Sequence, residues 1–345
     1  PMEYRLALIG FGTVGQGFVE ILRDQNVQLT EQFGVNFRIT GVSDVRLGSI
    51  HDPAGFEPEA LLDAVRNGGG LETIPALDQG WDATQMAQES AADVVVELSF
   101  TDLETGEPAT THVRKALESG KHVVTTNKGP VALHWPELSE LAGERGLQIG
   151  VEGTVMSGTP TVNLGLNLLR AANIRGVRGI LNGTCNYILT RMEAGSSYEH
   201  VLAEAQEKGY AEADPAGDVE GFDAAGKVVI LGNLLMDEPL AMSDVDRTGI
   251  SGLTLEDIES ATASGERWKL IGSLERGPDG VTASVAPQRV PLTHPLSSVG
   301  GAMNAITFDT ELMGEVTLVG AGAGRVETGY SVLVDLLEIH RTRSG

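Results

Sequence analysis

Apolar residues in the first 151 positions come in short runs, separated by segments in which they recur with helical spacing. Residues 4–9 form a run that stops at Gly10, and apolar positions then follow at three- and four-residue intervals through residue 22. The continuous run at 93–98 is typical of a strand buried in a parallel sheet. Further strands are predicted at 36–43, at the start of 121–130 before a loop, and at 147–151, with helices at 57–67, 107–119 and 136–145. Strands that alternate with helices predict an open parallel α/β sheet.

The pattern changes after residue 151, where longer loops rich in Gly, Asp and Pro appear. Two helices and two strands are predicted there, at 160–171, 197–208, 174–181 and 281–290. We therefore predict a second, α+β domain over residues 152–305. A glycine-rich turn at 320–324 precedes a terminal helix, so residues 306–345 are expected to return to domain 1–151 and complete it.

The chain is strongly acidic. Its 345 residues carry 48 acidic and 24 basic side chains, for a net charge of −24, and six of the basic residues are lysines. A chain of this charge repels nucleic acids and anionic membranes over most of its surface, so neither is expected as a partner. Acids spread along the whole sequence are typical of proteins from a high-salt cytoplasm, and an ordinary acidic enzyme is the alternative.

A single cysteine, Cys185, excludes an intramolecular disulfide and a cysteine-rich zinc site. No run approaches the ~20 apolar residues that cross a bilayer, and no basic-then-apolar leader precedes the first strand, so a cytoplasmic protein is expected. A nucleophilic cysteine would indicate an aldehyde dehydrogenase that passes through a thioester. A small buried thiol is the commoner outcome.

Residues 10–15, GFGTVG, form a G-x-G-x-x-G turn between a predicted strand and a predicted helix. Such glycines allow a tight turn, close approach of the backbone to a pyrophosphate, and helix–strand packing, and the helix N-terminus supplies N–H groups. The context favours dinucleotide binding over a purely structural turn, and it makes the first domain a doubly wound sheet of the Rossmann type. The residues expected at the cofactor phosphates are Gly10, Phe11, Gly12, Thr13, Val14 and Gly15.

Two residues at the end of the second strand favour different cofactors. Asp44 is placed to bind a ribose 2′-hydroxyl, which favours NAD. It lies further from the glycines than the usual ~20 residues, and we attribute the difference to an insertion at 24–36. Arg46 would instead meet the 2′-phosphate of NADP, so the choice between NAD and NADP stays open.

A lysine follows a cluster of acids in residues 209–231, GYAEADPAGDVEGFDAAGKVVIL. Asp223 and Lys227 are four residues apart and share a helix face. The apolar residues after Lys227 predict that this helix goes inward, where a lysine needs a charge partner. The alternative is a surface ion pair worth about 0.3–0.5 kcal/mol.

Two loops after predicted strands add candidate chemistry. Lys128 lies in TTNKGP, residues 125–130, at the carboxyl end of a strand, where ligands of such sheets bind. It is expected where a substrate meets the nicotinamide, and a solvated loop lysine is the alternative. Glu152 begins an irregular turn whose oxygens suit a hard cation, with a plain loop as the alternative.

These segments together resemble the homoserine dehydrogenases over nearly the whole chain. The matching segments, in order, are GFGTVG, TTNKGP, VEGTVMSGTP, LNGTCNYIL, GYAEADPAGDVEGFDAAGKVVIL, HPLSSVGGAMNAI and GAGAG. The resemblance implies NAD(P)-dependent interconversion of L-homoserine and L-aspartate 4-semialdehyde, a step in threonine, methionine and isoleucine biosynthesis. It also implies a homodimer that pairs through the second domain. Because the sequence stops at Gly345, we expect no regulatory domain and no threonine feedback through one.

The resemblance also implies roles for individual residues. Lys227 and Lys128 would flank the substrate hydroxyl, with Lys227 the favoured proton carrier. The substrate would be held by Glu212, Asp223, Asp218, Gly209 and Lys128, although Asp218 is equally placed to cap a helix. The nicotinamide would be bordered by Ser99, Thr125, Asn127, Lys128 and Gly322; Glu97, two residues before Ser99, departs from the family pattern. A sodium ion would be held by Glu152 and the backbone of Val155, Ser157 and Thr159.

Two other interpretations stay open. One is another NAD(P)-dependent amino-acid or semialdehyde dehydrogenase of the same fold, and the semialdehyde enzyme would need Cys185. The other is a non-catalytic dinucleotide-sensing protein, which would bind NAD(P)H without turnover.

Overall fold

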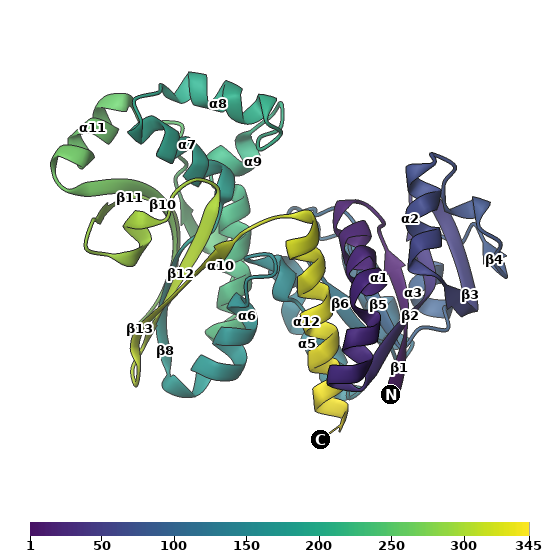
Figure 1. Cartoon of the computed structure of the whole chain (residues 1–345). Helices are drawn as coiled ribbons and strands as arrows, with labels where there is room; N and C mark the ends of the chain where they lie inside the picture. Colours follow the sequence, from purple (N-terminus) through teal and green to yellow (C-terminus); the bar gives the residue numbers. More distant parts are fainter. Residues whose placement is uncertain (345) are drawn as a thin grey trace. The chain divides into compact units, whose positions relative to one another are not determined.

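The computed structural model describes residues 1–344, and the chain divides into two compact units (Figure 1). Unit 1 contains Pro1–Gly158 and the chain from Ala323 onward, and unit 2 is Thr159–Gly322. The sequence pattern predicted the return to the first unit at residue 306. In the structure the two strands before Gly322 pair with the sheet of unit 2, so the chain leaves that unit later.

Unit 1 is built on a seven-stranded sheet with the order β4-β3-β2-β1-β5-β6-β7. Five neighbouring strands, β2, β1, β5, β6 and β7, are parallel, and β3 and β4 add an antiparallel edge. The strands are β1 (Met2–Ile9), β2 (Val35–Asp44), β3 (Gly48–Phe56), β4 (Asp78–Gln79), β5 (Val94–Glu97), β6 (His122–Thr125) and β7 (Ile149–Gly150). Because successive strands are added on both sides of β1, the sheet is doubly wound, which confirms the predicted fold class.

Helices cover both faces of this sheet. They are α1 (Thr13–Phe33), α2 (Pro58–Arg66), α3 (Ala83–Glu89), α4 (Ala109–Glu118), α5 (Lys128–Glu144) and α12 (Arg325–Ser344), with short 3-10 turns η1 (Leu71–Thr73) and η2 (Glu152–Thr154). Alternate residues of β1 face opposite cores. Leu6 and Leu8 join the core under α1 and α12, whereas Ala7 and Ile9 join the core under α3, α4 and α5.

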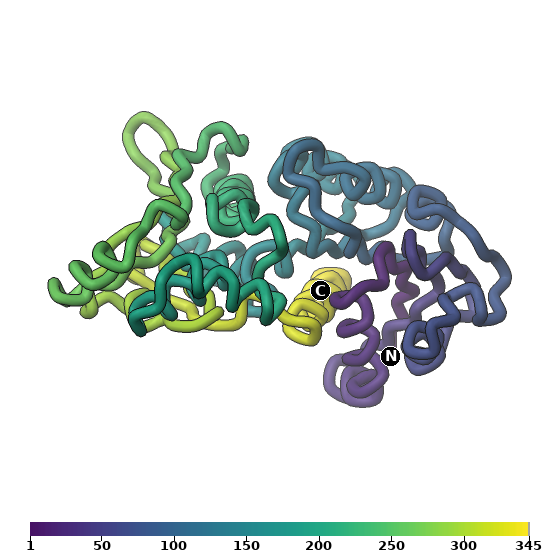
Figure 2. The backbone as a smooth tube through the Cα atoms, turned by 90° about the horizontal axis from the view of Figure 1, so that it is seen from above, coloured from purple at the N-terminus to yellow at the C-terminus, as the bar shows by residue number. Residues whose placement is uncertain are grey.

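The last helix completes the first of these cores. In α12, Val332, Leu336 and Ile339 are buried in the cluster that contains Phe18 of α1. Figure 2 shows the yellow backbone of α12 beside the purple N-terminal backbone, and Figure 1 shows α12 alongside α1. A Cβ on Gly329 would be 2.6 Å from the backbone nitrogen of Phe18, so the two helices pack closely. The C-terminal helix thus belongs to the same compact unit as the first 158 residues.

Two local predictions in unit 1 can be compared with the structure. Most of residues 24–36, which were interpreted as an insertion, belong to α1, because this helix runs without interruption to Phe33 and ends at Gly34 in the left-handed conformation (φ 68°). The distance from the glycine turn to Asp44 is therefore taken up by helix. Lys128 is not in a loop but is the first residue of α5, because Asn127 caps that helix and Pro130 is tolerated in its first turn.

Unit 2 is a six-stranded mixed sheet with the order β13-β12-β8-β10-β11-β9. Its strands are β8 (Ile174–Ile180), β9 (Val245–Arg247), β10 (Glu266–Gly277), β11 (Gly280–Pro291), β12 (Met303–Thr310) and β13 (Gly314–Ala321). Its helical segments are α6 (Thr161–Asn163), η3 (Leu164–Leu169), η4 (Arg170–Ala172), α7 (Gly183–Glu193), α8 (Tyr198–Glu207), α9 (Ala216–Val219), α10 (Phe222–Leu235), η5 (Met242–Asp244), α11 (Leu255–Ala263) and η6 (Pro295–Ser298). The helix α10 is buried along almost its whole length, as predicted from the apolar run after Lys227. No helix within residues 1–344 is long and apolar enough to cross a membrane.

Candidate active site

The glycine turn lies where β1 ends and α1 begins. Gly10 has a φ of 93°, and a Cβ there would be 2.6 Å from the carbonyl oxygen of Leu98, just after β5. Gly12 is exposed and has nothing within 4 Å of its Cβ position, whereas a Cβ on Gly15 would be 2.9 Å from the carbonyl oxygen of Gly10. The three glycines thus provide a tight turn, an open approach for a phosphate, and close helix packing, which are the features that a dinucleotide needs. The N–H groups of the exposed start of α1 fit a pyrophosphate.

Asp44 ends β2, and three backbone N–H groups hold its carboxylate. Oδ2 accepts from the N–H of Phe11 at 2.8 Å, and Oδ1 accepts from those of Arg46 at 2.8 Å and Leu47 at 3.0 Å. A carboxylate has about four acceptor positions, so Asp44 can still accept from a ribose hydroxyl. The side chain of Arg46 is exposed beside it.

A cleft of about 610 Å³ lies along this edge of unit 1. Gly10, Gly12, Asp44 and Arg46 line it together with residues 98–100 after β5. Trp81, which stacks on His51 with ring centroids 4.5 Å apart, forms an aromatic part of the wall. The volume falls in the range of small-molecule sites in proteins.

Glu97, the last residue of β5, is fully buried and turns its carboxylate onto the loop that follows. Oε1 accepts from the N–H of Ser99 at 2.7 Å, and Oε2 accepts from the Ser99 hydroxyl at 3.1 Å. Because a buried carboxylate is costly unless hydrogen-bonded, this pairing explains an acid at that position. Glu97 therefore fixes Ser99 at the edge of the cleft.

Asn127 ties the same loop to β6 and α5. Its Nδ2 donates to the carbonyls of Ser99 at 2.9 Å and Phe100 at 2.8 Å, and its Oδ1 accepts from the N–H of Gly129 at 3.0 Å. Its own N–H donates to Oγ1 of Thr125 at 3.0 Å. The structure thus brings Ser99, Thr125, Asn127 and Lys128 together at the carboxyl edge of the sheet, the edge that also carries the glycine turn.

The turn after β7 contains the residues predicted to hold a cation. Glu152 is fully buried, and its N–H donates to Oδ2 of Asp335 at 3.0 Å. Ser157 has a φ of 53°, an uncommon conformation for a non-glycine residue, and its hydroxyl is 2.7 Å from that of Thr328. Val155 is buried, and Thr159 begins unit 2. Within residues 1–344 no three His, Cys, Asp or Glu residues are grouped so that they could hold a metal, so a cation here would depend on backbone oxygens.

Lys227 lies on α10 in unit 2 and is 7% exposed. Its Nζ donates to the carbonyl of Leu181 at 2.6 Å and lies 3.0 Å from Oδ2 of Asp223, one turn earlier on the same helix. These contacts take two of the three ammonium donors. The burial excludes the alternative of a solvated surface ion pair.

Asn182, which the sequence reasoning missed, connects the acids around Lys227. Its Nδ2 donates to Oδ1 of Asp218 at 2.7 Å and to Oδ2 of Asp223 at 3.0 Å. Its Oδ1 accepts from the N–H of Cys185 at 2.8 Å and caps α7. The available signal was Asn182 itself in LNGTCNY, because asparagine is a favoured N-cap residue at a helix start. Asp218 is not a cap for α10, because that helix is preceded by Gly221.

Cys185 is fully buried beneath the same cluster, and its Sγ donates to the carbonyl of Asp218 at 3.2 Å. Burial raises the pKa of this thiol well above its usual range, and the nearby Asp218 and Asp223 raise it further. A nucleophilic cysteine requires the opposite shift. Cys185 is therefore a structural residue and does not support a thioester mechanism.

The remaining predicted residues of unit 2 lie in different surroundings. Gly209 (φ 73°) follows α8, and Glu212 is exposed a few residues later. Asp214 accepts from the N–H of Ala216 at 3.2 Å at the start of α9. At Gly322 a Cβ would overlap the amide of Asn304, so only glycine fits there.

A dinucleotide turn in one unit, and a buried lysine among carboxylates in the other, define an NAD(P)-dependent oxidoreductase. Two family models match this chain: "Homoserine dehydrogenase, NAD binding domain" over residues 10–152 and "Homoserine dehydrogenase" over residues 160–337. The chain belongs to the homoserine dehydrogenase family. It interconverts L-homoserine and L-aspartate 4-semialdehyde with NAD(P), and neither alternative interpretation is favoured.

Curated relatives and solved structures agree with this family. An NAD(+)-dependent homoserine dehydrogenase of Pseudomonas canavaninivorans is 44% identical, over 99% of this chain and 97% of the relative. A homoserine dehydrogenase of Methanocaldococcus jannaschii is 38% identical over 98% of each chain. The structure of a hyperthermophilic archaeal homoserine dehydrogenase mutant in complex with NADPH superposes with a TM-score of 0.85 at 29% identity, covering 99% of this chain and 98% of the other.

Proposed function

We propose that Lys227 is the group that accepts the hydroxyl proton of L-homoserine and returns it in the reverse reaction. Oxidation of an alcohol to an aldehyde removes a hydride from carbon and a proton from oxygen, and the bound nicotinamide supplies the hydride acceptor. A positioned amine can carry the proton. The observation that carries this assignment is the hydrogen bonding of Nζ by the Leu181 carbonyl and Asp223, which fixes the amine on a buried helix.

The other charged groups are assigned to substrate binding. We propose that Glu212, Asp218 and Asp223, with the backbone at Gly209, hold the substrate, and that Glu212 meets its ammonium group. Support comes from the exposure of Glu212, which leaves its carboxylate accessible, and from Asn182, which aligns Asp218 with Asp223. Lys128, with its backbone fixed by the cap of α5, is assigned to the substrate hydroxyl beside the nicotinamide. We propose that Ser99, Thr125, Asn127 and Gly322 border the nicotinamide beside Lys128.

We propose a preference for NAD over NADP. Asp44, Glu72 and Asp82 all line the cleft of unit 1, together with Arg46 and His112. Glu72 lies over the turn after β2, with Oε1 at 3.1 Å from a Cβ position on Gly48. A 2′-phosphate carries about −1.5 to −2 charges near pH 7, so these carboxylates oppose it, whereas Asp44 can accept from a 2′-hydroxyl. The relative from Pseudomonas canavaninivorans is named as NAD(+)-dependent.

The KM for NADP⁺ is expected to exceed that for NAD⁺ by about tenfold or more, in line with 1–2 kcal/mol of like-charge repulsion. Replacing Glu72→Gln should lower the KM for NADP⁺ by about two- to fivefold and leave that for NAD⁺ unchanged, because Glu72 is exposed and partly screened. Glu31→Gln, an exposed acid on α1, is the control. Equal KM values for both cofactors in the native protein would rule out the preference.

We propose that a sodium ion binds Glu152 and the backbone oxygens of Val155, Ser157 and Thr159. An all-oxygen donor set suits a hard cation, and the left-handed Ser157 shapes the turn. Such an ion would stabilise the fold of this turn by linkage. The melting temperature is expected to be higher in sodium chloride than in choline chloride of equal ionic strength, with the difference lost in Glu152→Gln. A difference that persists in that variant would argue against the site.

We propose that the protein is a cytoplasmic homodimer that pairs through the sheet of unit 2. Residues of β8, β10, β11, β12 and β13 line a shallow cavity of about 480 Å³ on that sheet, with Arg178, Ser273 and Gln288 among them. Sedimentation equilibrium is expected to give twice the chain mass of 36.3 kDa. Ser273→Arg should lower this mass toward that of one chain, and Ser264→Arg, after α11, should not. A single-chain mass for the native protein would contradict the dimer.

A further inference from the structure

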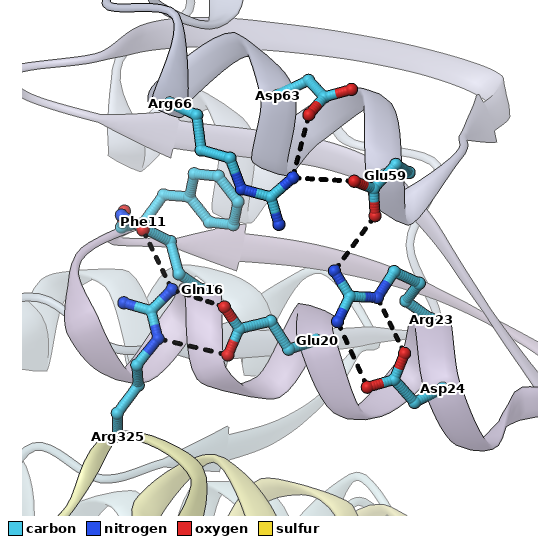
Figure 3. Close-up of polar contacts among 9 residues, drawn as sticks. All are labelled: Phe11, Gln16, Glu20, Arg23, Asp24, Glu59, Asp63, Arg66 and Arg325. Carbon is cyan, nitrogen blue, oxygen red and sulfur yellow. Dashed lines mark hydrogen bonds and ion pairs between the residues drawn. The ribbon is translucent and has the colours of Figure 1, made fainter.

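Both peptide groups of Phe11 are held by side chains. Its N–H, in the peptide that follows Gly10, donates to Asp44. Its carbonyl, in the peptide that leads to Gly12, accepts from Nε2 of Gln16 at 2.9 Å (Figure 3). A trans peptide is planar, so its carbonyl and its N–H point in opposite directions. The bond from Gln16 therefore fixes the direction of the Gly12 N–H, which belongs to the exposed start of α1.

Gln16 is itself oriented by the helix that returns from unit 2. Oε1 of Gln16 accepts from Nη2 of Arg325 at 3.3 Å. A guanidinium only donates hydrogen bonds, so it requires the amide oxygen of Gln16 on its side. The amide NH₂ is then necessarily directed at the Phe11 carbonyl.

Arg325 is fixed more firmly than a typical surface arginine. It makes two bonds to the carboxylate of Glu20, Nη2 to Oε1 at 2.7 Å and Nε to Oε2 at 3.2 Å. Its guanidinium lowers the pKa of Glu20 below the usual range. A Cβ on Gly17 would overlap the carbonyl of Arg325, so the first turn of α12 lies directly against α1. Figure 3 shows Arg325 reaching from α12 to both acceptors.

Arg325 also lies three residues after Gly322, where the chain passes from unit 2 back into unit 1. We propose that Gln16 and Arg325 are positioning residues for the dinucleotide. Gln16 orients the Gly12 N–H toward the pyrophosphate. Arg325, at the start of α12 where the chain re-enters unit 1, orients the side chain of Gln16. These roles refine the NAD(P) site of unit 1, and cofactor binding in the absence of substrate measures them directly.

The test is a fluorescence titration of the purified protein with NADH in the absence of substrate. Gln16→Met keeps the side-chain length but cannot bond the Phe11 carbonyl, and it is expected to raise the Kd by about three- to tenfold, the size of one hydrogen bond. Gln28→Met, the same change at an exposed position further along α1, is the control and should leave the Kd unchanged. With saturating cofactor, kcat of Gln16→Met should stay within about twofold of the native value, because the residue acts on binding.

Arg325→Met is the second variant and leaves the glycine turn's own bonds in place. It is expected to raise the Kd by about two- to fivefold. Arg341→Met, which removes an ion pair with Glu338 on the same helix, is its control. Because Arg325 acts through Gln16, the double variant should bind NADH no more weakly than Gln16→Met alone. A Gln16→Met protein that binds as well as its control, or fully additive effects in the double variant, would overturn the proposal.

Discussion

Lys227→Met is expected to lower kcat for homoserine oxidation by about 10²–10⁴-fold, the range for loss of a positioned proton carrier. Methionine matches the length of lysine and suits the buried surroundings of α10, where Lys227 is 7% exposed. Asp223 keeps its hydrogen bond from Asn182 at 3.0 Å, so the acid is not left without a donor. The Kd for NADH, measured without substrate, should not change, because the cofactor turn belongs to unit 1.

Lys227→Arg adds a second check, because an arginine stays charged at any ordinary pH and cannot accept a proton. It should be about as inactive as Lys227→Met. Lys208→Met, which removes an exposed ion pair with Glu204 in the same unit, is the matched control and should retain activity. Cys185→Ala should retain turnover as well, since the buried thiol has no chemical role in this mechanism. Loss of turnover in Cys185→Ala together with an active Lys227→Met would refute the assignment.

Lys128→Met is expected to lower kcat/KM for homoserine by about 10²-fold or more, because one cation at the substrate hydroxyl is lost. The protein should remain as stable as before or gain slightly. Lysine at the first position of α5 opposes the helix dipole, a placement that costs about 0.3–1 kcal/mol. A lysine that lowers stability at the carboxyl edge of the sheet is better explained by a functional role than by a structural one.

Kinetic and thermal measurements on the same preparations separate these effects. Lys115→Met, which removes an exposed pair with Glu118 on α4, is the control for unit 1. A Lys128→Met protein that loses activity in proportion to a fall in melting temperature would assign the lysine to folding. An active and stable Lys128→Met protein would remove it from the site altogether.

The dinucleotide turn could be predicted in detail because each glycine has a local reason that is written in the sequence. Gly10, Gly12 and Gly15 are spaced by the geometry of one strand, one turn and one helix, and the structure gives each the expected surroundings. The burial of Lys227 could also be predicted from the sequence, since the apolar run after it predicts a buried helix. Both signals are contained within a few consecutive residues.

The features that were missed depend on residues far apart in the sequence. Asn182 bonds Asp218 and Asp223, which lie 36 and 41 residues further along the sequence, and no periodic pattern in the sequence predicts that contact. Glu97 looked misplaced near a cofactor because nothing in the sequence says that it turns onto Ser99. At Lys128 the error was local: Asn-Lys-Gly-Pro has the composition of a turn, and the capping role of Asn127 outweighed it.

Unit 1 is formed by two separate segments of the chain, so it cannot be completed until its last helix has been synthesised. Domains tend to fold as they emerge from the ribosome, N-terminal ones first. Here residues 159–322 emerge whole, while the earlier unit still lacks α12, whose Val332, Leu336 and Ile339 complete its core. Unit 1 therefore matures last. Until then the residues of α1 that pack against α12 are exposed to chaperones, to proteases and to other nascent chains.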